Sequence, residues 1–348
     1  MIRKVIAKAA RGNHLSESEM IDVMDYIMEG KASPAQIGAL LIALRMKGET
    51  VEEIAGAAKV MRAKVSEVPT LARSSGEALV DTVGTGGDGA GTFNVSTTTA
   101  FVVAGCGLKV AKHGNRAVSS SCGSADLIEA LGVPLDLDPQ RLGECIDQAG
   151  IGFLFAPVLH KAMRHAIGPR REIGLRSIFN LLGPLTNPAG ATVLLVGVYD
   201  QRLVRPLAEV LARLGAESAM VVHGDGGLDE VTITGRTHVA RLVDGEVTEY
   251  VITPEDMGFP QASLDEIKGG DTKINRCQTL AVLSGKPGAR RDMVLMNAAA
   301  ALVTAGKAGD FRDGAAQAAK SIDSGAAMAR LQDLRAVANS PVMQIAQA

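Results

Sequence analysis

Aromatic residues are scarce in this chain, which has no tryptophan, three tyrosines and seven phenylalanines among 348 residues. Surfaces that hold single-stranded nucleic acid by stacking its bases need more aromatic side chains than that. The 36 lysines and arginines nearly balance the 38 aspartates and glutamates, which gives a net charge of −2. This balance excludes bulk electrostatic attraction to nucleic acid or to an anionic membrane. Any site for an anion must therefore be built locally.

Long apolar runs and paired cysteines are also missing. No stretch of about 18 apolar residues predicts a transmembrane helix, and Lys8 interrupts the apolar segment that a secretory signal would need. We expect reduced thiols and no zinc site, because no Cys-x-x-Cys pair occurs among the four cysteines, Cys106, Cys122, Cys145 and Cys277. These absences indicate a folded protein of the cytoplasm that contacts neither a membrane nor nucleic acid.

The first 70 residues have the pattern of a small helical domain. Three capping boxes, in which Ser or Thr stands three residues before Glu or Gln, begin at Ser16, Ser33 and Thr50. The helix after Ser33 is apolar on two faces, so it is either buried between two layers or covered by a second subunit. The second of these faces consists of Ala35, Ala39, Ile42 and Met46.

After residue 75 short apolar strands alternate with helices, as in a parallel sheet that is covered on both faces. The predicted strands are Leu79–Val83, Leu108–Ala111, Ile151–Phe155, Thr192–Val198, Ser218–Val222, Thr237–Val243 and Glu246–Ile252. Asp244-Gly245, between the last two strands, indicates a hairpin. We therefore predict a helical domain of residues 1–70, with about 160–185 packing back on it. The second domain, residues 75–159 and 190–348, is an α/β domain with a mixed, mostly parallel sheet.

Five glycines stand at positions 84 to 91, directly after the first predicted strand. Gly84, Gly86 and Gly89 match the Gly-x-Gly-x-x-Gly pattern of dinucleotide sites, but no acidic residue follows the next strand to hold a ribose. The backbone amides of this loop, with the N-terminus of a helix that begins near Asn94, favour an anion. The hydroxyl of Ser96, in the first turn of that helix, is a candidate magnesium ligand.

A second loop with anion-binding chemistry follows the next strand, between residues 112 and 124. It contains Lys112, His113, Arg116 and four serines. Because ligands of α/β proteins bind at the carboxyl ends of parallel strands, we expect both loops to face one crevice that suits a phosphate.

The adjacent carboxylates Asp229 and Glu230 follow another apolar strand. They are interpreted either as a general acid and base or as a magnesium site, and the two phosphate loops favour magnesium. Arg170 has the side chain that best matches a carboxylate, but alone it is more typical of a surface or interdomain ion pair.

Together these segments resemble the anthranilate phosphoribosyltransferase family of tryptophan biosynthesis. The resemblance rests on Gly84-Thr85-Gly86-Gly87-Asp88, Asn94-Val95-Ser96-Thr97, Lys112-His113-Gly114-Asn115-Arg116, the segment 180–188 and Leu228-Asp229-Glu230. It implies a fold like that of nucleoside phosphorylases and phosphoribosyltransferases, a homodimer assembled through the small domain, and two magnesium ions. The implied reaction transfers phosphoribose from phosphoribosyl diphosphate to the amine of anthranilate and releases diphosphate. Whether a glutamine amidotransferase, the anthranilate synthase partner, associates with the chain stays open.

The resemblance also implies the residues of the site. Phosphoribosyl diphosphate would lie against Gly84, Gly87, Asp88, Thr92, Asn94, Val95, Ser96, Thr97, Lys112, His113, Gly114, Asn115, Arg116, Ala117, Val118, Ser119, Ser120 and Ser124. Magnesium would be held by Ser96, Asp229 and Glu230. Anthranilate would contact Gly84, Asn115 and Arg170, with His113 and His160 near its ring. No residue is expected to act as acid or base, because an aryl amine is already unprotonated at neutral pH. Catalysis is expected to be electrostatic, through Lys112 and the magnesium site.

Three other functions fit parts of this pattern. A pyrimidine nucleoside phosphorylase has a similar fold and an anion loop, but it has less need of the pair Asp229-Glu230. A nucleic-acid-binding relative without enzymatic activity would be markedly basic, which this chain is not. An oxidoreductase that uses a dinucleotide would match only the glycine pattern.

Overall fold

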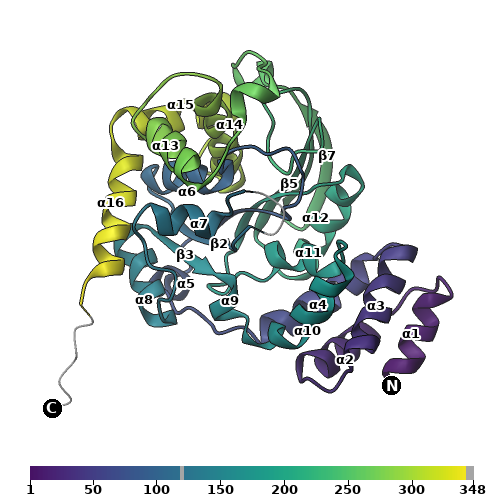
Figure 1. Cartoon of the computed structure of the whole chain (residues 1–348). Helices are drawn as coiled ribbons and strands as arrows, with labels where there is room; N and C mark the ends of the chain where they lie inside the picture. Colours follow the sequence, from purple (N-terminus) through teal and green to yellow (C-terminus); the bar gives the residue numbers. More distant parts are fainter. Residues whose placement is uncertain (118–120, 342–348) are drawn as a thin grey trace.

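A seven-stranded sheet forms the centre of the computed structural model, which describes residues 1–117 and 121–341 (Figure 1). Its order is β3-β2-β1-β4-β5-β6-β7. The strands are β1 (Leu79–Gly84), β2 (Lys109–Gly114), β3 (Ile151–Phe155), β4 (Val193–Gly197), β5 (Ser218–Gly224), β6 (Thr237–Val243) and β7 (Glu246–Ile252). Strands β3, β2, β1, β4 and β5 run parallel, whereas β6 and β7 are antiparallel. The predicted mixed, mostly parallel sheet is confirmed.

Four helices form the N-terminal bundle, namely α1 (Ile2–Ala10), α2 (Glu17–Met28), α3 (Pro34–Lys47) and α4 (Val51–Ala63). Capping boxes begin α2, α3 and α4 at Ser16, Ser33 and Thr50, as the sequence predicts. Two later helices pack back on this bundle: α10 (Arg164–Ile173) contacts α2 and α3, and α11 (Ile178–Leu182) contacts α4.

The remaining helices belong to the α/β part of the chain. They are α5 (Leu71–Ser75), α6 (Val95–Gly105), α7 (Ser124–Ala130), α8 (Pro139–Glu144), α9 (Ala156–Leu159), α12 (Val204–Arg213), α13 (Thr272–Leu283), α14 (Ala289–Thr304), α15 (Phe311–Asp323) and α16 (Ala326–Asn339). Helix α5 lies where the two predicted domains meet. Thr70 caps its first turn, and Gly76 ends it in the left-handed conformation.

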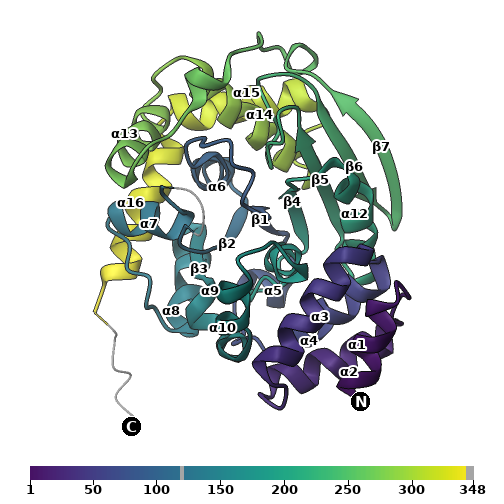
Figure 2. The ribbon, with the colours of Figure 1, turned by 45° about the vertical axis from the view of Figure 1, so that its right-hand side comes forward.

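The sheet divides the interior into two large apolar layers, because alternate residues of a strand point to opposite faces. On β4, Leu195 packs with α6 and α14, whereas Leu194 and Val196 pack with α12 and the N-terminal bundle. Figure 2 shows α6, α13 and α16 on one side of the sheet and α12 with α3 and α4 on the other. The small helical domain therefore shares a core with the sheet and is not joined to it by a linker alone.

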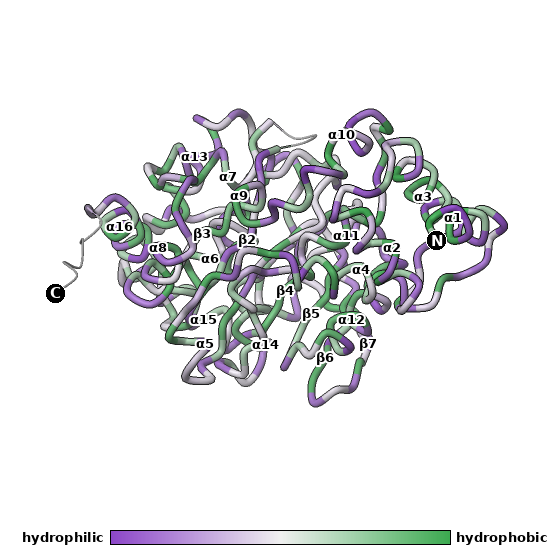
Figure 3. The backbone as a smooth tube through the Cα atoms, turned by 90° about the horizontal axis from the view of Figure 1, so that it is seen from below, coloured by the Kyte–Doolittle hydropathy of each residue, from purple (hydrophilic) through white to green (hydrophobic). Residues whose placement is uncertain are grey.

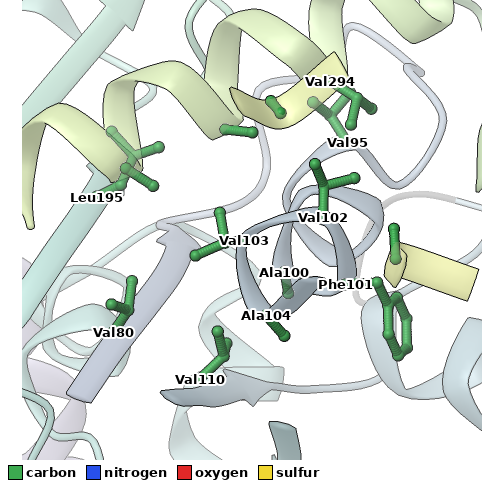
Figure 4. Packing of buried hydrophobic residues seen from close by; sticks show 14 of the residues in the cluster. Val80, Val95, Ala100, Phe101, Val102, Val103, Ala104, Val110, Leu195 and Val294 are labelled. Carbon is green, nitrogen blue, oxygen red and sulfur yellow. The ribbon is translucent and has the colours of Figure 1, made fainter. Parts of the chain in front are cut away.

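Helix α6, which follows the glycine-rich loop, is almost completely enclosed. Val102 and Val103 lie between the strand residues Val80 and Val110 and the helix α14, where Val294 faces them (Figure 4). A helix that is apolar on all sides is stable only inside such a sandwich. The buried helix holds the loop before it at a fixed place above the sheet.

Most of the second apolar face of α3 is not covered by the described residues, although Ile42 is half-buried. Met46 is 84% exposed, and Ala35 and Ala39 are also exposed. Helix α3 contacts both α1 and α10, but the interpretation that its second face is also buried is wrong for Ala35, Ala39 and Met46.

Two local predictions agree with the structure in detail. Asp244 and Gly245 both have positive φ, 51° and 80°, as the two-residue turn between β6 and β7 requires. Among the described residues, no helix is long and apolar enough to cross a membrane. The N-terminus lies at the end of the molecule occupied by the helical bundle, and the C-terminal helix α16 lies at the opposite end (Figure 3).

Candidate active site

Three loops that carry predicted site residues follow parallel strands at one edge of the sheet. We name them the glycine loop (residues 84–94, after β1), the basic loop (residues 112–124, at the end of β2) and the acidic segment (residues 224–231, after β5). β1 lies between β2 and β4, and β4 pairs with β5. Because parallel strands end at the same edge, the loops converge there, as expected for an α/β ligand site.

The acidic segment is bonded directly to the glycine loop and to the start of α6. The amide of Gly86 donates to Asp229 Oδ2 at 2.7 Å, and the amide of Ser96 donates to Glu230 Oε1 at 3.0 Å. Gly84 has no room for a side chain, because a Cβ there would lie 3.0 Å from Asp229 Cγ and closer still to Oδ2. The structure thus brings together the three residues proposed to hold a metal ion.

Buried carboxyl groups crowd together at this point. Burial, and then the neighbouring Asp88, raise the pKa of Asp229 to about 7. Burial, and then Asp229, raise the pKa of Glu230 well above its usual value, although Lys112 opposes the shift. Crowded carboxylates attract a cation, and oxygen is the donor that Mg²⁺ prefers.

The arrangement fits magnesium better than a metal held by protein alone. Within residues 1–117 and 121–341, no three His, Cys, Asp or Glu side chains stand close enough together to hold an ion. Magnesium commonly uses one or two carboxylates and completes its shell with water and substrate phosphates. The site therefore suits an ion that arrives with a phosphorylated substrate.

Lys112 places a buried ammonium group beneath the loops. The residue is 3% exposed, and its Nζ donates to the carbonyl of His113 at 3.0 Å. Burial lowers its pKa, while the charges of Asp81, Glu230 and Asp229, in that order, oppose this effect. The cation is thus fixed in place and faces carboxylates on two sides.

Arg116 does not join Lys112 in supplying charge to the crevice. Its guanidinium pairs with Asp126 at 2.7 Å and with Glu129 at 3.0 Å, both on α7. The loop is closed at its base, where the Asn115 amide donates to Ser124 Oγ and that hydroxyl donates to the Asn115 carbonyl, each at 3.1 Å. Three predicted contacts lie outside the described residues, namely Val118, Ser119 and Ser120.

The other predicted contacts differ in which groups they leave available to a ligand. The side chains of Val95 and Thr97 are buried in α6, each 1% exposed. Thr92 pairs with Lys268 in an isolated bridge. Gly114 and Ala117 offer no polar side chain, and the Ala117 amide already donates to Asp126 Oδ2. Asp88 Oδ1 accepts from the amide of Ala90 inside the glycine loop.

A separate group of residues lies between β2, α10 and α11. The guanidinium of Arg170 stands 5.1 Å from the centre of the Phe179 ring, and no ion pair to a described residue is recorded for it. Nε2 of His113 and Nε2 of His160 are 3.2 Å apart. His113 Nδ1 also lies 3.1 Å from the carbonyl oxygen of Gly183.

The two imidazoles are neutral in the folded protein. Burial, and then His160, lower the pKa of His113 to about 3, and burial lowers the pKa of His160 to about 4. Since a carbonyl can only accept, His113 Nδ1 carries a hydrogen, and His160 Nε2 then donates to His113 Nε2. This leaves His160 Nδ1 as a buried acceptor for which no partner occurs in the described part of the chain.

Sequence reasoning missed the residues that brace these loops from behind. Asn275 on α13 donates to Asn94 Oδ1 at 2.8 Å, and Asn94 in turn donates to the carbonyl of Cys122 in the basic loop at 3.2 Å. Asn297 on α14 accepts from the amide of Val231 and donates to its carbonyl, at 3.0 and 2.8 Å. The available signal is weak, since each is a single asparagine on a helix that is otherwise partly apolar.

Arg176 is a further cation that the motifs did not assign. Its guanidinium lies 4.1 Å from the centre of the Tyr199 ring. A Cβ on Gly87 would stand 3.3 Å from its Nε, so the side chain reaches the glycine loop. Arg45 of α3 donates to its carbonyl at 2.6 Å, which ties the same residue to the helical bundle.

Two family models cover most of the chain. Residues 3–65 match the helical bundle domain of a glycosyl transferase family, and residues 76–328 match the a/b domain of that family. The two matches together include every loop described above.

Full-length relatives agree with these matches. The chain is 52% identical over 350 residues to the anthranilate phosphoribosyltransferase of Geotalea daltonii, which covers 98% of this chain and 100% of that protein. The crystal structure of the enzyme of that name from Thermus thermophilus is 43% identical and superposes with a TM-score of 0.91, covering 97% and 99% of the two chains. The Saccharomyces cerevisiae enzyme, in complex with phosphoribosyl diphosphate and Mg, is 29% identical with a TM-score of 0.88, covering 98% of each chain.

Proposed function

We infer the chemistry of this site from one premise, that the chain belongs to the anthranilate phosphoribosyltransferase family. The protein transfers the 5-phosphoribosyl group from 5-phosphoribosyl 1-diphosphate to the amine of anthranilate, in tryptophan biosynthesis. The products are N-(5-phosphoribosyl)anthranilate and diphosphate. What the residues of this chain contribute to that reaction is our proposal.

We propose that phosphoribosyl diphosphate binds between the glycine loop and the basic loop. The observation that supports this most strongly is the convergence of three kinds of group at one sheet edge: backbone amides, the buried Lys112 and the carboxylates of Asp229 and Glu230. The leaving diphosphate gains negative charge as its bond to the sugar breaks. Amides and an ammonium group that are already fixed in place stabilise this charge without reorganising, which is the main way such sites lower a barrier.

Ser96, Asp229 and Glu230 would hold magnesium, and we propose two ions. Bound magnesium would screen the growing charge on the diphosphate. The chain keeps the two carboxylates in place through the amides of Gly86 and Ser96. Replacing Asp229 and Glu230 together by alanine is expected to abolish turnover and to flatten the dependence of residual activity on magnesium concentration. A magnesium titration that matches the wild type would reject these residues as ligands.

The anthranilate subsite is proposed to lie beside Arg170, Asn115 and Gly84. The guanidinium of Arg170 stacks on Phe179 and pairs with no carboxylate in the described part of the chain, so it is available for the carboxylate of the substrate. The neutral rings of His113 and His160, tilted by 43° to each other, offer uncharged surfaces to an aromatic amine. Because that amine is unprotonated at neutral pH, positioning suffices and no general base is needed.

We further propose that the enzyme is a homodimer joined through the N-terminal bundle. The apolar face of α3 that includes Ala35, Ala39 and the 84% exposed Met46 supports this proposal. A cytoplasmic location and the association with a glutamine amidotransferase stay predictions from the sequence.

A fluorescence assay for the formation of N-(5-phosphoribosyl)anthranilate tests the function. Purified protein with both substrates and magnesium should convert anthranilate, and omission of magnesium should stop the reaction. Thymidine with inorganic phosphate serves as the matched alternative pair of substrates. Phosphorolysis of thymidine without transfer to anthranilate would overturn the assignment.

A further inference from the structure

Strands β1 and β2 separate before their loops begin. The two strands pair only at Leu79 with Lys109 and at Val80 with Val110. In contrast, β2 remains paired with β3 as far as Gly114. The end of β2, which carries two residues of the proposed site, therefore lacks its partner strand on one side.

This separation leaves backbone N–H and C=O groups of β2 without a partner strand, and these groups lie in the interior of the protein. The amide of Val110 points to β3, where it donates to the carbonyl of Gly150 at 2.9 Å. Successive residues of a parallel strand direct their backbone groups to alternate sides, so those of Ala111 and His113 point toward β1. A buried backbone group without a partner is costly.

Asp81 and Asn187 satisfy both of these groups. Asp81 Oδ1 accepts from the amide of His113 at 3.1 Å. Asn187 Nδ2 donates to the carbonyl of Ala111 and to Asp81 Oδ2, at 2.8 Å in each case. Asp81 is completely buried and Asn187 is 6% exposed, so water does not replace either side chain. The pair takes the place of the missing strand contact.

The residues clamped in this way flank Lys112. Ala111 and His113 are its two neighbours in the chain, and Asp81 is the charge that most strongly favours its protonated form. The segment of Asn187 also reaches the ring of His113, because the carbonyl of Gly183 lies 3.1 Å from Nδ1. The backbone of His113 is thus fixed by Asp81 and its side chain by the carbonyl of Gly183, and neither Asp81 nor Gly183 makes a proposed contact with substrate.

We propose that Asp81 is a positioning residue for the transfer reaction. Paired with Asn187, it fixes the end of β2 where the strands part, and so sets where Lys112 and His113 stand relative to the glycine loop. The proposal rests on the proposed function of that site. Asp81 touches no substrate in this scheme and acts through the backbone of β2.

The variant Asp81→Asn tests this at constant size. An amide keeps an oxygen at only one of the two positions that Oδ1 and Oδ2 of Asp81 occupy, so either the contact with His113 or the contact with Asn187 is lost. We expect kcat to fall by roughly 10²-fold, the loss typical of a misplacement near 1 Å. The magnesium midpoint should stay unchanged, because the acidic segment is held by the amides of Gly86 and Ser96. A merely structural role would instead lower the melting temperature and leave kcat of the folded fraction unaltered.

Two further variants sharpen the test. The single variant Asn187→Asp places a second carboxylate beside Asp81 and should lower kcat. The double variant with Asp81→Asn again pairs a donor with an acceptor, so it should recover part of the lost kcat. Ser321→Ala is the matched control: it removes another buried hydrogen bond, from Ser321 Oγ to the carbonyl of Val102 at 2.9 Å, far from the loops. Its kcat should equal that of the wild type.

The outcomes separate this proposal from the function itself. A wild-type protein that forms no N-(5-phosphoribosyl)anthranilate would refute the function. An active wild type together with an Asp81→Asn variant of equal kcat would refute the positioning role alone. If Asp81→Asn fails to fold, Asn187→Ala decides by the same split between kcat and the magnesium midpoint. Failure of both to fold would also overturn the proposal, because the pair would then determine folding and not the place of the loop.

Discussion

Replacing Gly84 by alanine should disable the metal site through a single methyl group. The backbone of Gly84 is not in the left-handed region, so the substitution brings no conformational strain of its own. The new Cβ would lie 3.0 Å from Asp229 Cγ and overlap Oδ2, whereas ordinary contact begins at 3.4 Å. Asp229 cannot yield without cost, because Oδ2 is bonded to the Gly86 amide at 2.7 Å.

The size of the effect follows from this geometry. The carboxylate must move by about 1 Å, and a misplacement of that order costs about 10²-fold in rate, or about 2.7 kcal/mol of barrier. The assay follows product fluorescence over a magnesium titration. We expect kcat to fall and the magnesium midpoint to rise, while the melting temperature changes little.

Gly309→Ala is the matched control for this change. Gly309 also has no positive φ, and a Cβ there meets nothing within 4 Å. It should leave kcat and the magnesium midpoint as they are. A Gly84→Ala enzyme with the wild-type kcat and midpoint would refute the reasoning, since Asp229 would then have no fixed position to lose.

Three further outcomes are expected. Arg170→Ala should raise the KM for anthranilate and leave the KM for phosphoribosyl diphosphate unchanged. Arg164→Ala, on the same helix, is the control. Equal loss of both affinities would contradict the proposed binding of anthranilate by Arg170. Met46→Glu should yield monomers in light scattering. Leu71→Glu is the control, because Leu71 is 73% exposed but lies away from α3, and it should leave the dimer intact. A Met46→Glu variant that stays dimeric would exclude the exposed face of α3 as the dimer contact. The pKa of His160 is lowered to about 4 in the folded protein. Between pH 6.5 and pH 4 the unfolded chain therefore binds a proton at His160 and the folded protein does not, so the free energy of unfolding decreases as the pH falls through this range. In urea unfolding, His160→Gln should reduce this pH-dependent loss of stability by about 3 kcal/mol. If the variant and the wild type lose stability equally with falling pH, the imidazole of His160 is not held neutral.

Local chemistry made much of the fold predictable. The capping boxes at Ser16, Ser33 and Thr50 are complete within four residues, and the hairpin at Asp244 needs only two residues. Strand ends are harder to predict from local sequence. Strand β2 continues to Gly114, beyond its apolar residues, because β3 extends alongside it. Tertiary pairing, and not side-chain type, decides where such a strand stops.

The parts of the site that escaped prediction depend on distant contacts. The many glycines at 84–91 predict an anion-binding loop. Nothing near Asn94 in the sequence indicates that Asn275 will bind its side chain. The pairing of Arg116 with Glu129 was also hidden, because a free and a paired arginine look alike in a sequence. Asp81 sits in an apolar strand, and its use becomes visible only when β1 and β2 are seen to part.

The bond between Asn94 and Asn275 spans 181 residues, and that between Ser96 and Glu230 spans 134. The ribosome must therefore synthesise most of the polypeptide before Asn275 and Glu230 can bond to the glycine loop and the start of α6. Folding that depends on such remote pairings is slow and leaves apolar surface exposed meanwhile. Newly made chains should consequently gain affinity for the activated sugar only near the end of synthesis, and fragments that stop before α13 should have none.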